Sequence, residues 1–460
     1  MLNLGLSAFF ACLILLGFRR PFIWVLCYLY VDIVAPQIIS WGFLTQIPTS
    51  LIAFAAAFLG WLVFDDKRDS RFTWRQGLLG VLLLYCAITT LRADYPVEAL
   101  TKWSWVWKAL VFAMFLPLTL RTRLRIEAVA LFMVLSASAL IIDGGLKTAM
   151  GGSGYGALRI FVDNNTGLYE GSIISCVAIA LIPVAVWLAK HGTIFPPEWR
   201  VWLFTAALIF ACSLIPIGTQ ARTGLVCLAI LAGLYLRTAK HRFLLSAGMT
   251  LAVLIAVPFL PQSFLARMNT IEDHQSDQSA GTRLGVWKWT LGYVKDHPFG
   301  GGFEVYMSSK VSYDTVTTQK VGSMVTVTRT PIVEEGRAFH SSYFEMLGEQ
   351  GYPGLALWLL LQVSGIVQME MIRRRWKNRT GPDEAWAAPL AVALQLAQVV
   401  YMIGSLFVGI AFQPFILMLI GLQCGLWSYL KRIDRPAPAP RGARRPMRVP
   451  GQTATQEVAG

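Results

Sequence analysis

Long apolar runs dominate this sequence and limit what it can fold into. Stretches close to the roughly 20 residues that an α-helix needs to cross a bilayer recur along most of the chain. Of the 460 residues, 55% are hydrophobic and 14% are charged, whereas soluble globular proteins carry roughly 25% charged residues. A membrane β-barrel would show short alternating segments instead. The sequence therefore predicts an all-α polytopic membrane protein, and it argues against a soluble enzyme, a disordered chain, a coiled coil or a secreted disulfide scaffold.

The apolar runs predict about 12–13 transmembrane helices within one helical domain, residues 1–430. The thirteen runs are 4–18, 22–40, 49–64, 77–91, 103–120, 126–142, 170–189, 201–219, 222–238, 243–260, 342–368, 386–408 and 411–430. Because several runs are short for a hydrocarbon layer of about 30 Å, tilted or half-length helices are expected among them. If the first run does not span, the count is twelve and the N-terminus lies inside rather than outside.

The net charge of +14 follows the pattern of a membrane protein and not that of a nucleic-acid-binding protein. Basic residues cluster in short loops, which the positive-inside rule assigns to the cytoplasm. These clusters are Arg121 to Arg125, Lys190 to Arg200, Arg237 to Arg242 and Arg373 to Arg379. Residues 431–460 form a basic, Pro-rich tail that is predicted to be disordered and cytoplasmic. Loops 92–102, 143–169, 219–222 and 261–341 then face the periplasm.

No pattern for a metal or cofactor is present in the sequence. The seven cysteines all lie inside apolar runs without metal-like spacing, so we expect small core residues rather than ligands or disulfides. A Walker motif and a His-Glu-x-x-His motif are also missing. The prediction is a protein with no metal and no cofactor.

The large loop, residues 261–341, is the only sizeable extramembrane piece. Residues 280–296 place Leu284, Trp287, Leu291 and Val294 on one apolar stripe, which predicts an amphipathic helix. His297-Pro298 ends this helix, and a turn with three glycines follows. We expect the helix to lie on the membrane surface and to cover a cavity between the spans.

His340 is the first candidate for chemistry. Ser342-x-x-Glu345 before an apolar run is a capping-box pattern, which predicts a helix that begins near Ser342. A helix N-terminus favours anions and disfavours imidazolium, so His340 is a candidate neutral base beside a phosphate-binding site. The alternative is that His340 only forms a hydrogen bond within the loop.

Two arginines at the same predicted face are candidates for phosphate binding. Arg222 follows Gln220 in a tight turn between two apolar runs. An arginine at the membrane end of such runs needs a partner or a polar cavity, and its guanidinium suits phosphate. Its alternative role is an interfacial anchor. Arg283 lies four residues before Trp287, so the two share a helix face that suits a sugar–pyrophosphate ligand. The alternative there is an ordinary interfacial helix.

Loop 151–170 is a weaker candidate. It contains a Gly-rich stretch, then Arg159, then Asp163-Asn164-Asn165. The glycines do not follow a predicted strand, so a nucleotide-binding fingerprint is not met. Arg159 is a candidate phosphate contact, and a flexible external loop is the alternative.

At these sites the sequence resembles the O-antigen ligase and O-antigen polymerase superfamily. The matching stretches are Thr219-Gln-Ala-Arg222-Thr-Gly, Gly281-Thr-Arg283 with Trp287, Asp296-His-Pro-Phe-Gly300-Gly-Gly, Phe339-His340-Ser-Ser-Tyr343 and Gly348-Glu-Gln-Gly351-Tyr-Pro-Gly354. Their order along roughly residues 120–430 makes the resemblance fairly specific. The first hundred residues look closer to the exosortase-associated O-glycosylation ligases.

The resemblance implies a GT-C-like, inverting, metal-independent glycosyltransferase of the bacterial inner membrane. The implied donor is a glycan on undecaprenyl pyrophosphate, and the implied acceptor is a lipid A–core sugar, with a protein hydroxyl or another lipid-linked repeat as alternatives. His340 would be the general base at the periplasmic face, and Arg222, Arg283, Arg337 and Arg159 would bind the pyrophosphate. Gln220, Trp287, Lys288 and Tyr343 would support them.

A solute transporter or flippase is the alternative from another functional class. Transporters tend to show internal repeats, broken helices and charges at the bilayer midplane. This sequence has no clear repeat, and its ionisable residues gather toward one face. That distribution favours chemistry at a surface, and a purely structural scaffold would leave the external arginines and histidine unexplained.

Overall fold

The computed structural model describes residues 2–40, 43–67, 71–151, 168, 170–238, 241–256, 260, 264, 278–321 and 324–434. In chain order the elements are α1 (Leu2–Arg19), α2 (Phe22–Val34), α3 (Pro36–Ile39), α4 (Phe43–Gln46), α5 (Thr49–Phe64), α6 (Trp74–Leu91), α7 (Pro96–Thr119), α8 (Arg123–Ala149), α9 (Gly171–His191), α10 (Trp199–Gly218), α11 (Arg222–Thr238), α12 (Arg242–Ala256), α14 (Gln278–Asp296), the 3₁₀ helix η3 (Val305–Ser308), strands β1 (Lys310–Val321) and β2 (Met324–Glu335), α15 (Ser342–Trp376), α16 (Ala387–Gly404) and α17 (Pro414–Ile433). Residues 435–460 of the predicted tail, most of loop 151–170 and residues 265–277 lie outside the described residues, whereas the first residues of that tail, 431–433, belong to α17.

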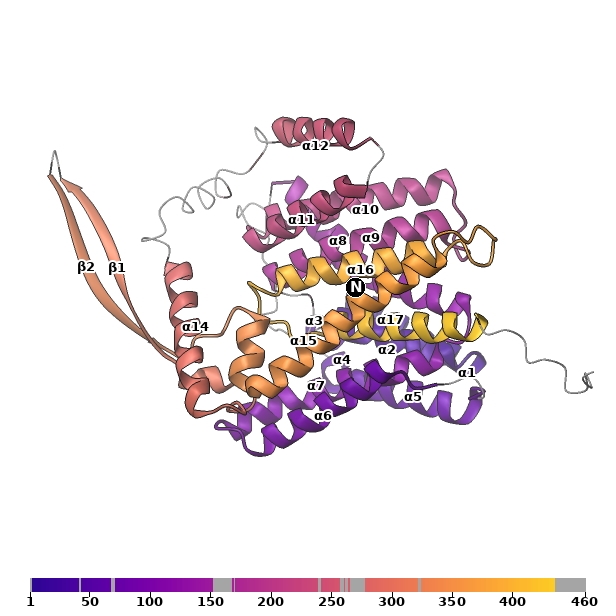
Figure 1. The fold of residues 1–460 in the computed structure, drawn as a ribbon, viewed down its shortest axis with the longest axis horizontal. Coiled ribbons are helices and arrows are strands. Elements are labelled where there is room, and N and C mark those ends of the chain that lie inside the picture. Colours follow the sequence, from indigo (N-terminus) through magenta and orange to yellow (C-terminus); the bar gives the residue numbers. More distant parts are fainter. Residues whose placement is uncertain are drawn as a thin grey trace, which may run out of the picture.

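The protein is an all-α polytopic membrane protein, as the sequence predicts. Each of the thirteen predicted runs overlaps a helix, although the run 22–40 is divided between α2 and α3. Most of these helices lie side by side in one bundle, and α12 lies apart at the top of the view (Figure 1). Within the described residues, seven helices are long and apolar enough to cross a membrane, namely α6, α8, α9, α10, α15, α16 and α17. Helices α1, α2 and α5 are apolar but shorter. The number of crossings and the orientation of the N-terminus stay predictions.

The predicted cytoplasmic loops gather at one end of the bundle. Arg125 makes two hydrogen bonds to the Asp65 carboxylate, at 2.6 and 3.0 Å. Its neighbour Arg123 donates to the carbonyl oxygens of His191 and Pro382, at 3.0 and 3.1 Å. The loops after α5 and α9 and the loop before α16 therefore all meet the start of α8.

The loops of the opposite predicted face gather at the other end. Tyr293 of α14 donates its hydroxyl to Asp94 at 2.5 Å, and the Asp94 amide donates to the carbonyl of Gly301 at 2.9 Å. The Ser342 amide donates to the Ser405 carbonyl at 2.8 Å. Helix α14 and the strands β1 and β2 lie at this end, on the left in Figure 1.

The large loop holds more than the predicted amphipathic helix. Residues 310–335 form an antiparallel hairpin in which Lys310 pairs with Glu335 and Val321 with Met324, and it projects away from the bundle (Figure 1). Runs rich in Val and Thr on both sides of Gly322-Ser323 are typical of a hairpin. The prediction for this loop named only amphipathic helices and did not include the hairpin.

Helix α14 forms where it was predicted, but the predicted apolar stripe is wrong in two members. Leu284 and Leu291 are 63% and 49% exposed. The buried face is instead Val286, Thr290 and Val294, at i, i+4 and i+8, because the helix packs against β1 and α15. The two leucines remain on an outer face, where a membrane surface would cover them.

The cysteines are free, as predicted, and six are buried. Cys12 is the exception, since it is exposed on α1. That helix packs mainly against α2, so much of its apolar surface stays uncovered by protein. The prediction of a core position is wrong for Cys12.

A buried polar network ties α6 to α15 and α17. Arg75 is 0% exposed and donates to the side-chain oxygen of Gln423 at 3.1 Å, the carbonyl of Leu361 at 3.3 Å and the side-chain oxygen of Gln368 at 3.4 Å. Such bonds between helices are among the forces that hold membrane bundles together, because hydrophobic burial contributes little between lipid-embedded helices.

We expect Arg75→Ala to destabilise the bundle by about 2–4 kcal/mol. The substitution leaves a cavity, and it removes the donor for the buried side-chain oxygens of the network. The measurement is thermal unfolding in detergent. Arg71→Ala, four residues earlier at an exposed position, is the matched control and should leave the unfolding midpoint nearly unchanged. Equal midpoints for the two variants would contradict a stabilising role for the Arg75 network.

Candidate active site

A break in α15 supports the candidate site. At Gly351 the backbone leaves the helical conformation (φ 65°, ψ −169°), so nearby amides and carbonyls lose their helical partners. The loop after α14 supplies new ones. The amides of Gly301 and Gly302 donate to the carbonyls of Gly348 and Glu349, at 3.1 and 2.9 Å. In return the amide that follows Gly351 donates to the carbonyl of Pro298 at 3.0 Å.

Glycine is required at the break because two backbones meet there. A Cβ at Gly351 would lie 2.3 Å from the Pro298 carbonyl oxygen, and the positive φ angle disfavours any other residue. The motifs Gly300-Gly-Gly and Gly348-Glu-Gln-Gly351 are therefore two halves of one contact. They form the framework of the site and do not themselves present reactive groups.

A buried ion cluster seals this contact. The Lys102 ammonium of α7 donates to the carboxylates of Glu345 at 2.7 Å and Glu349 at 2.8 and 3.0 Å, and Glu304 lies 3.5 Å away. The side chains of Lys102, Glu345 and Glu349 are 12%, 8% and 0% exposed. Backbone amides complete the cluster, since Glu304 donates to Glu349 at 3.0 Å and Ala411 donates to Glu345 at 3.1 Å.

The helix that follows His340 begins where the sequence predicts, but the capping box is wrong. Ser341 is the N-cap of α15 and its side chain makes no capping bond. The Ser342 hydroxyl instead donates to the carbonyl of Val408 at 2.9 Å and accepts from the amide of Ile410 at 2.8 Å. Glu345 turns to Lys102. Both predicted capping side chains, Ser342 and Glu345, therefore bind the loop before α17 instead of the first turn of α15.

The residue before His340 is anchored from three sides. The Phe339 ring is 3% exposed and packs edge-on against Tyr306 at 5.7 Å. It fits over Gly348, where a Cβ would lie 2.6 Å from the ring. Trp287 donates its indole N–H to the Phe339 carbonyl at 2.8 Å and stacks on Phe344 at 4.8 Å. Trp287 thus holds the His340 turn, as a supporting residue would.

Charges from separate elements act on the His340 imidazole. Partial burial lowers the pKa of His340 below its ordinary value of 6.5, and the positive charges of Arg283 and Arg337 lower that pKa further. The carboxylate of Glu170 acts in the opposite sense and raises the pKa. These effects together favour the neutral form of the His340 imidazole, and the charge of Arg283 on α14 is one of their causes.

The Arg222 turn lies against the start of α9. The Thr219 and Ser175 hydroxyls form a hydrogen bond at 2.9 Å, and a Cβ at Gly171 would lie 3.0 Å from Thr219. Glu170, the N-cap of α9, accepts from the amide of Ile173 at 2.9 Å. Because Glu170 also acts on His340, the turn that bears Arg222 and the turn that bears His340 belong to one neighbourhood.

Backbone strain concentrates in this neighbourhood. Among the described non-glycine residues, four have a positive φ angle, and three of these lie at this end: Gln220 (54°), Glu304 (63°) and His340 (48°). Such conformations persist only where the surrounding structure enforces them, and they cluster at functional sites. Gln220 lies in the turn before Arg222, Glu304 belongs to the ion cluster, and His340 is the candidate base.

The structure describes three of the other predicted site residues. Arg337 lies near His340 but forms a two-point ion pair with Glu334, with both bonds 2.7 Å long. Tyr343 faces the bundle, where its hydroxyl donates to the Met402 carbonyl at 3.2 Å, so it attaches α15 to α16. Lys288 is exposed on α14. Arg159 lies outside the described residues.

Sequence reasoning did not find two parts of this neighbourhood. Glu170 looks like the last residue of a loop, and only its place before an apolar run marks it as a helix cap. Lys102 lies more than 200 positions before its carboxylate partners, so sequence spacing gives no sign of the cluster. One signal is available: a lysine at the start of an apolar run must find a partner or a polar cavity.

Comparisons with known proteins match two segments of the chain to different families. Residues 1–193 match a family of unknown function (DUF5935). Residues 206–359 match the family described as O-Antigen ligase. This match supports a relation to the O-antigen ligase superfamily. No curated protein matches the sequence.

The O-antigen ligase segment contains Arg222, Arg283 and His340, and it ends after the break in α15. It supports a glycosyl-transferring, ligase-like function rather than a solute transporter. The segment of unknown function contributes Lys102 and Glu170 to the same neighbourhood. The two families therefore meet around His340 and the broken helix.

We expect Lys102→Met to lower the free energy of unfolding by about 3–5 kcal/mol, because it leaves buried carboxylates without their cation. Thermal unfolding in detergent measures this loss. Lys147→Met, which breaks the exposed pair with Asp143, is the control and should cost about 1 kcal/mol or less. The double variant Lys102→Met/Glu349→Gln also removes the charge of one carboxylate that lost its cation. It should therefore recover part of the lost free energy of unfolding, and no recovery would contradict the electrostatic explanation.

Proposed function

We propose that the protein is an inner-membrane glycosyltransferase of the O-antigen ligase type. It transfers a glycan from undecaprenyl pyrophosphate to a hydroxyl of a lipid A–core sugar, at the periplasmic face and with inversion at the anomeric carbon. Neither a metal nor a cofactor takes part.

The observation that carries this proposal is the setting of His340. It is held in a left-handed turn, and its pKa is lowered by partial burial and by the charge of Arg283. A base must be unprotonated before it can accept a proton. The O-antigen ligase match over residues 206–359 supports the reaction class.

The mechanism needs a base for the acceptor and positive charge for the leaving group. His340 accepts the proton of the acceptor hydroxyl as that oxygen attacks the anomeric carbon of the donor. The bond from this carbon to the pyrophosphate oxygen breaks, and undecaprenyl pyrophosphate leaves with the electron pair. Arg222 and Arg283 bind the pyrophosphate and stabilise its growing charge, because guanidinium groups form paired bonds to phosphate oxygens. Arg337 and Arg159 assist them.

Glu170 has a positioning role in this scheme. Its carboxylate caps α9 beside the Arg222 turn and raises the pKa of His340. Glu170 therefore offsets part of the effect of the arginines on the pKa of His340, and the imidazole stays basic enough to accept a proton. The arginines still attract the pyrophosphate.

A reconstituted transfer assay tests the proposed reaction. The full chain in detergent with EDTA receives undecaprenyl-pyrophosphate glycan, with lipid A–core in one sample and no acceptor in the other. Product that depends on lipid A–core supports the ligase. Lengthened lipid-linked glycan without acceptor would identify a polymerase, and absence of transfer in both samples would favour a protein acceptor or a transporter.

We expect His340→Ala and Arg222→Ala each to abolish detectable transfer. A general base contributes about 10²–10⁴-fold to the rate and a charged donor at the leaving group about 10²–10³-fold. His241→Ala and Arg237→Ala, at exposed positions of the opposite end, are matched controls and should retain activity. All four variants should unfold at the wild-type temperature, and normal transfer by either site variant would falsify the assignment.

The pH dependence gives a separate test of His340. As the pH falls through the lowered pKa of His340, the imidazole gains a proton, so the rate should fall on an acid limb centred below pH 6.5. Glu170→Gln keeps the capping oxygen but removes the charge that raises this pKa, so the acid limb should move to lower pH. Glu98→Gln, another helix-first-turn acid, should leave the profile in place. An acid limb that moves to higher pH in Glu170→Gln would contradict the role given to Glu170.

A further inference from the structure

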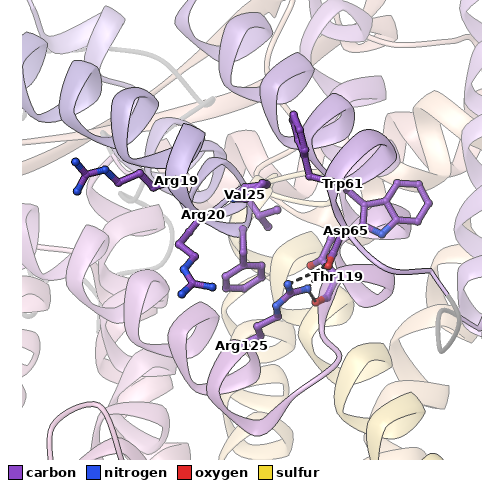
Figure 2. A pocket seen from close by; sticks show the side chains of 10 residues that line it. Arg19, Arg20, Val25, Trp61, Asp65, Thr119 and Arg125 are labelled. Carbon is purple, nitrogen blue, oxygen red and sulfur yellow. Dashed lines mark hydrogen bonds and ion pairs between the residues drawn. The ribbon is translucent and has the colours of Figure 1, made fainter.

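A polar cavity of about 210 Å³ lies at the opposite end of the bundle from His340. Its walls come from the end of α1, the starts of α2 and α8, and the ends of α5 and α7. They include Arg19, Arg20, Asp65, Thr119 and Arg125 (Figure 2). This end carries the loops that the positive-inside rule assigns to the cytoplasm.

The cavity has an excess of positive charge. Three arginines line it against one acid, Asp65. That carboxylate is already engaged, because it accepts two hydrogen bonds from Arg125 and lies 3.6 Å from Arg121. Asp65 thus neutralises Arg125, and the charges of Arg19 and Arg20 have no acidic partner among the residues that line the cavity.

The guanidinium groups of Arg20 and Arg125 both line the cavity. Arg125 uses three of its five N–H groups in its described bonds, two to Asp65 and one to the Thr119 carbonyl. Its guanidinium is fixed over the Phe22 ring at 4.9 Å. Arg20 extends from the end of α1 toward the same space, whereas Arg19 points away from it (Figure 2).

The surfaces around the cavity are apolar. Phe18 of α1 is 72% exposed, and Val63 and Phe64 of α5 are 66% and 68% exposed. Phe64 and Trp61 also line the cavity. Tryptophan is typical of the membrane–water interface, so the polar cavity opens where headgroups meet acyl chains.

We propose that this cavity binds the phosphate of an anionic phospholipid. Arg20 and Arg125 hold the phosphodiester oxygens, and the acyl chains lie on the exposed apolar faces of α1 and α5. The lipid then attaches α1, which otherwise packs mainly against α2, to the ends of α5 and α8. The inference is independent of the transfer reaction, because it involves neither His340 nor the pyrophosphate site.

Native mass spectrometry of the full chain tests this proposal. Protein in detergent receives equal amounts of phosphatidylglycerol and phosphatidylcholine with the same acyl chains. We expect the wild type to retain phosphatidylglycerol in preference. Arg20→Gln should weaken that binding at least about tenfold, the loss expected for one charge-assisted contact.

Arg19→Gln is the matched control, since it removes the same charge one residue away. General attraction of basic residues to an anionic surface gives about fivefold per residue, so Arg19→Gln should weaken binding by no more than that. Equal losses in the two variants would overturn the proposal. Arg20→Lys keeps the charge but lacks the planar fork, and we expect an intermediate loss; it also serves if Arg20→Gln does not fold.

A second arm separates a lipid from a free anion. Inorganic phosphate in large excess should not displace phosphatidylglycerol, because the acyl chains contribute to binding. Displacement, or a phosphate adduct in place of the lipid, would mean that the cavity takes free phosphate, and it would contradict the lipid assignment.

Discussion

The contact between the broken helix α15 and the glycine loop after α14 is the constraint on which the rest of the site depends. Breaking a helix exposes amides and carbonyls that must find new partners when buried. Here a second backbone supplies them, in a geometry that only glycine permits at Gly351. A residue with a side chain at this position would separate the loop after α14 from α15. The α14 residues of the candidate site would then move away from His340.

The same contact determines where His340 lies. Glu349, next to the break, accepts from Lys102 and from the Glu304 amide, which fixes the start of η3. Tyr306 of η3 then packs on Phe339, and Phe339 lies over Gly348. His340 follows directly in a left-handed turn. Buried ion pairs often add little net stability because desolvation offsets their attraction, so the role of the cluster is better understood as selecting this one arrangement of α7, η3 and α15.

Much of the fold could be predicted from the sequence because membrane spans are long and apolar. The thirteen runs, the gathering of loops at two ends and the start of α15 all follow from local composition. The capping box failed because Ser342 and Glu345 have partners in the loop at 405–411 and on α7, which no local pattern reveals. The stripe on α14 failed for a related reason: its helix has two apolar faces, and only tertiary packing decides which one the protein covers. His340, Arg222 and Arg283 could be selected because polar groups beside apolar runs are costly without a function, whereas Glu170 and Lys102 act through distant partners.

The first 193 residues contribute charged groups to the surroundings of the candidate site. Their match is to a family of unknown function, and apolar helices alone would suggest a membrane anchor. Two observations argue otherwise. Glu170 acts on the pKa of His340 against the field of the arginines, and Lys102 supplies the cation for the carboxylates at the break. Since the base and the helix break lie in the O-antigen ligase segment, removing the first segment would leave His340 in an uncompensated positive field and Glu349 buried without its counter-ion. The charged groups around the candidate site therefore come from both segments, and the proposed site requires both.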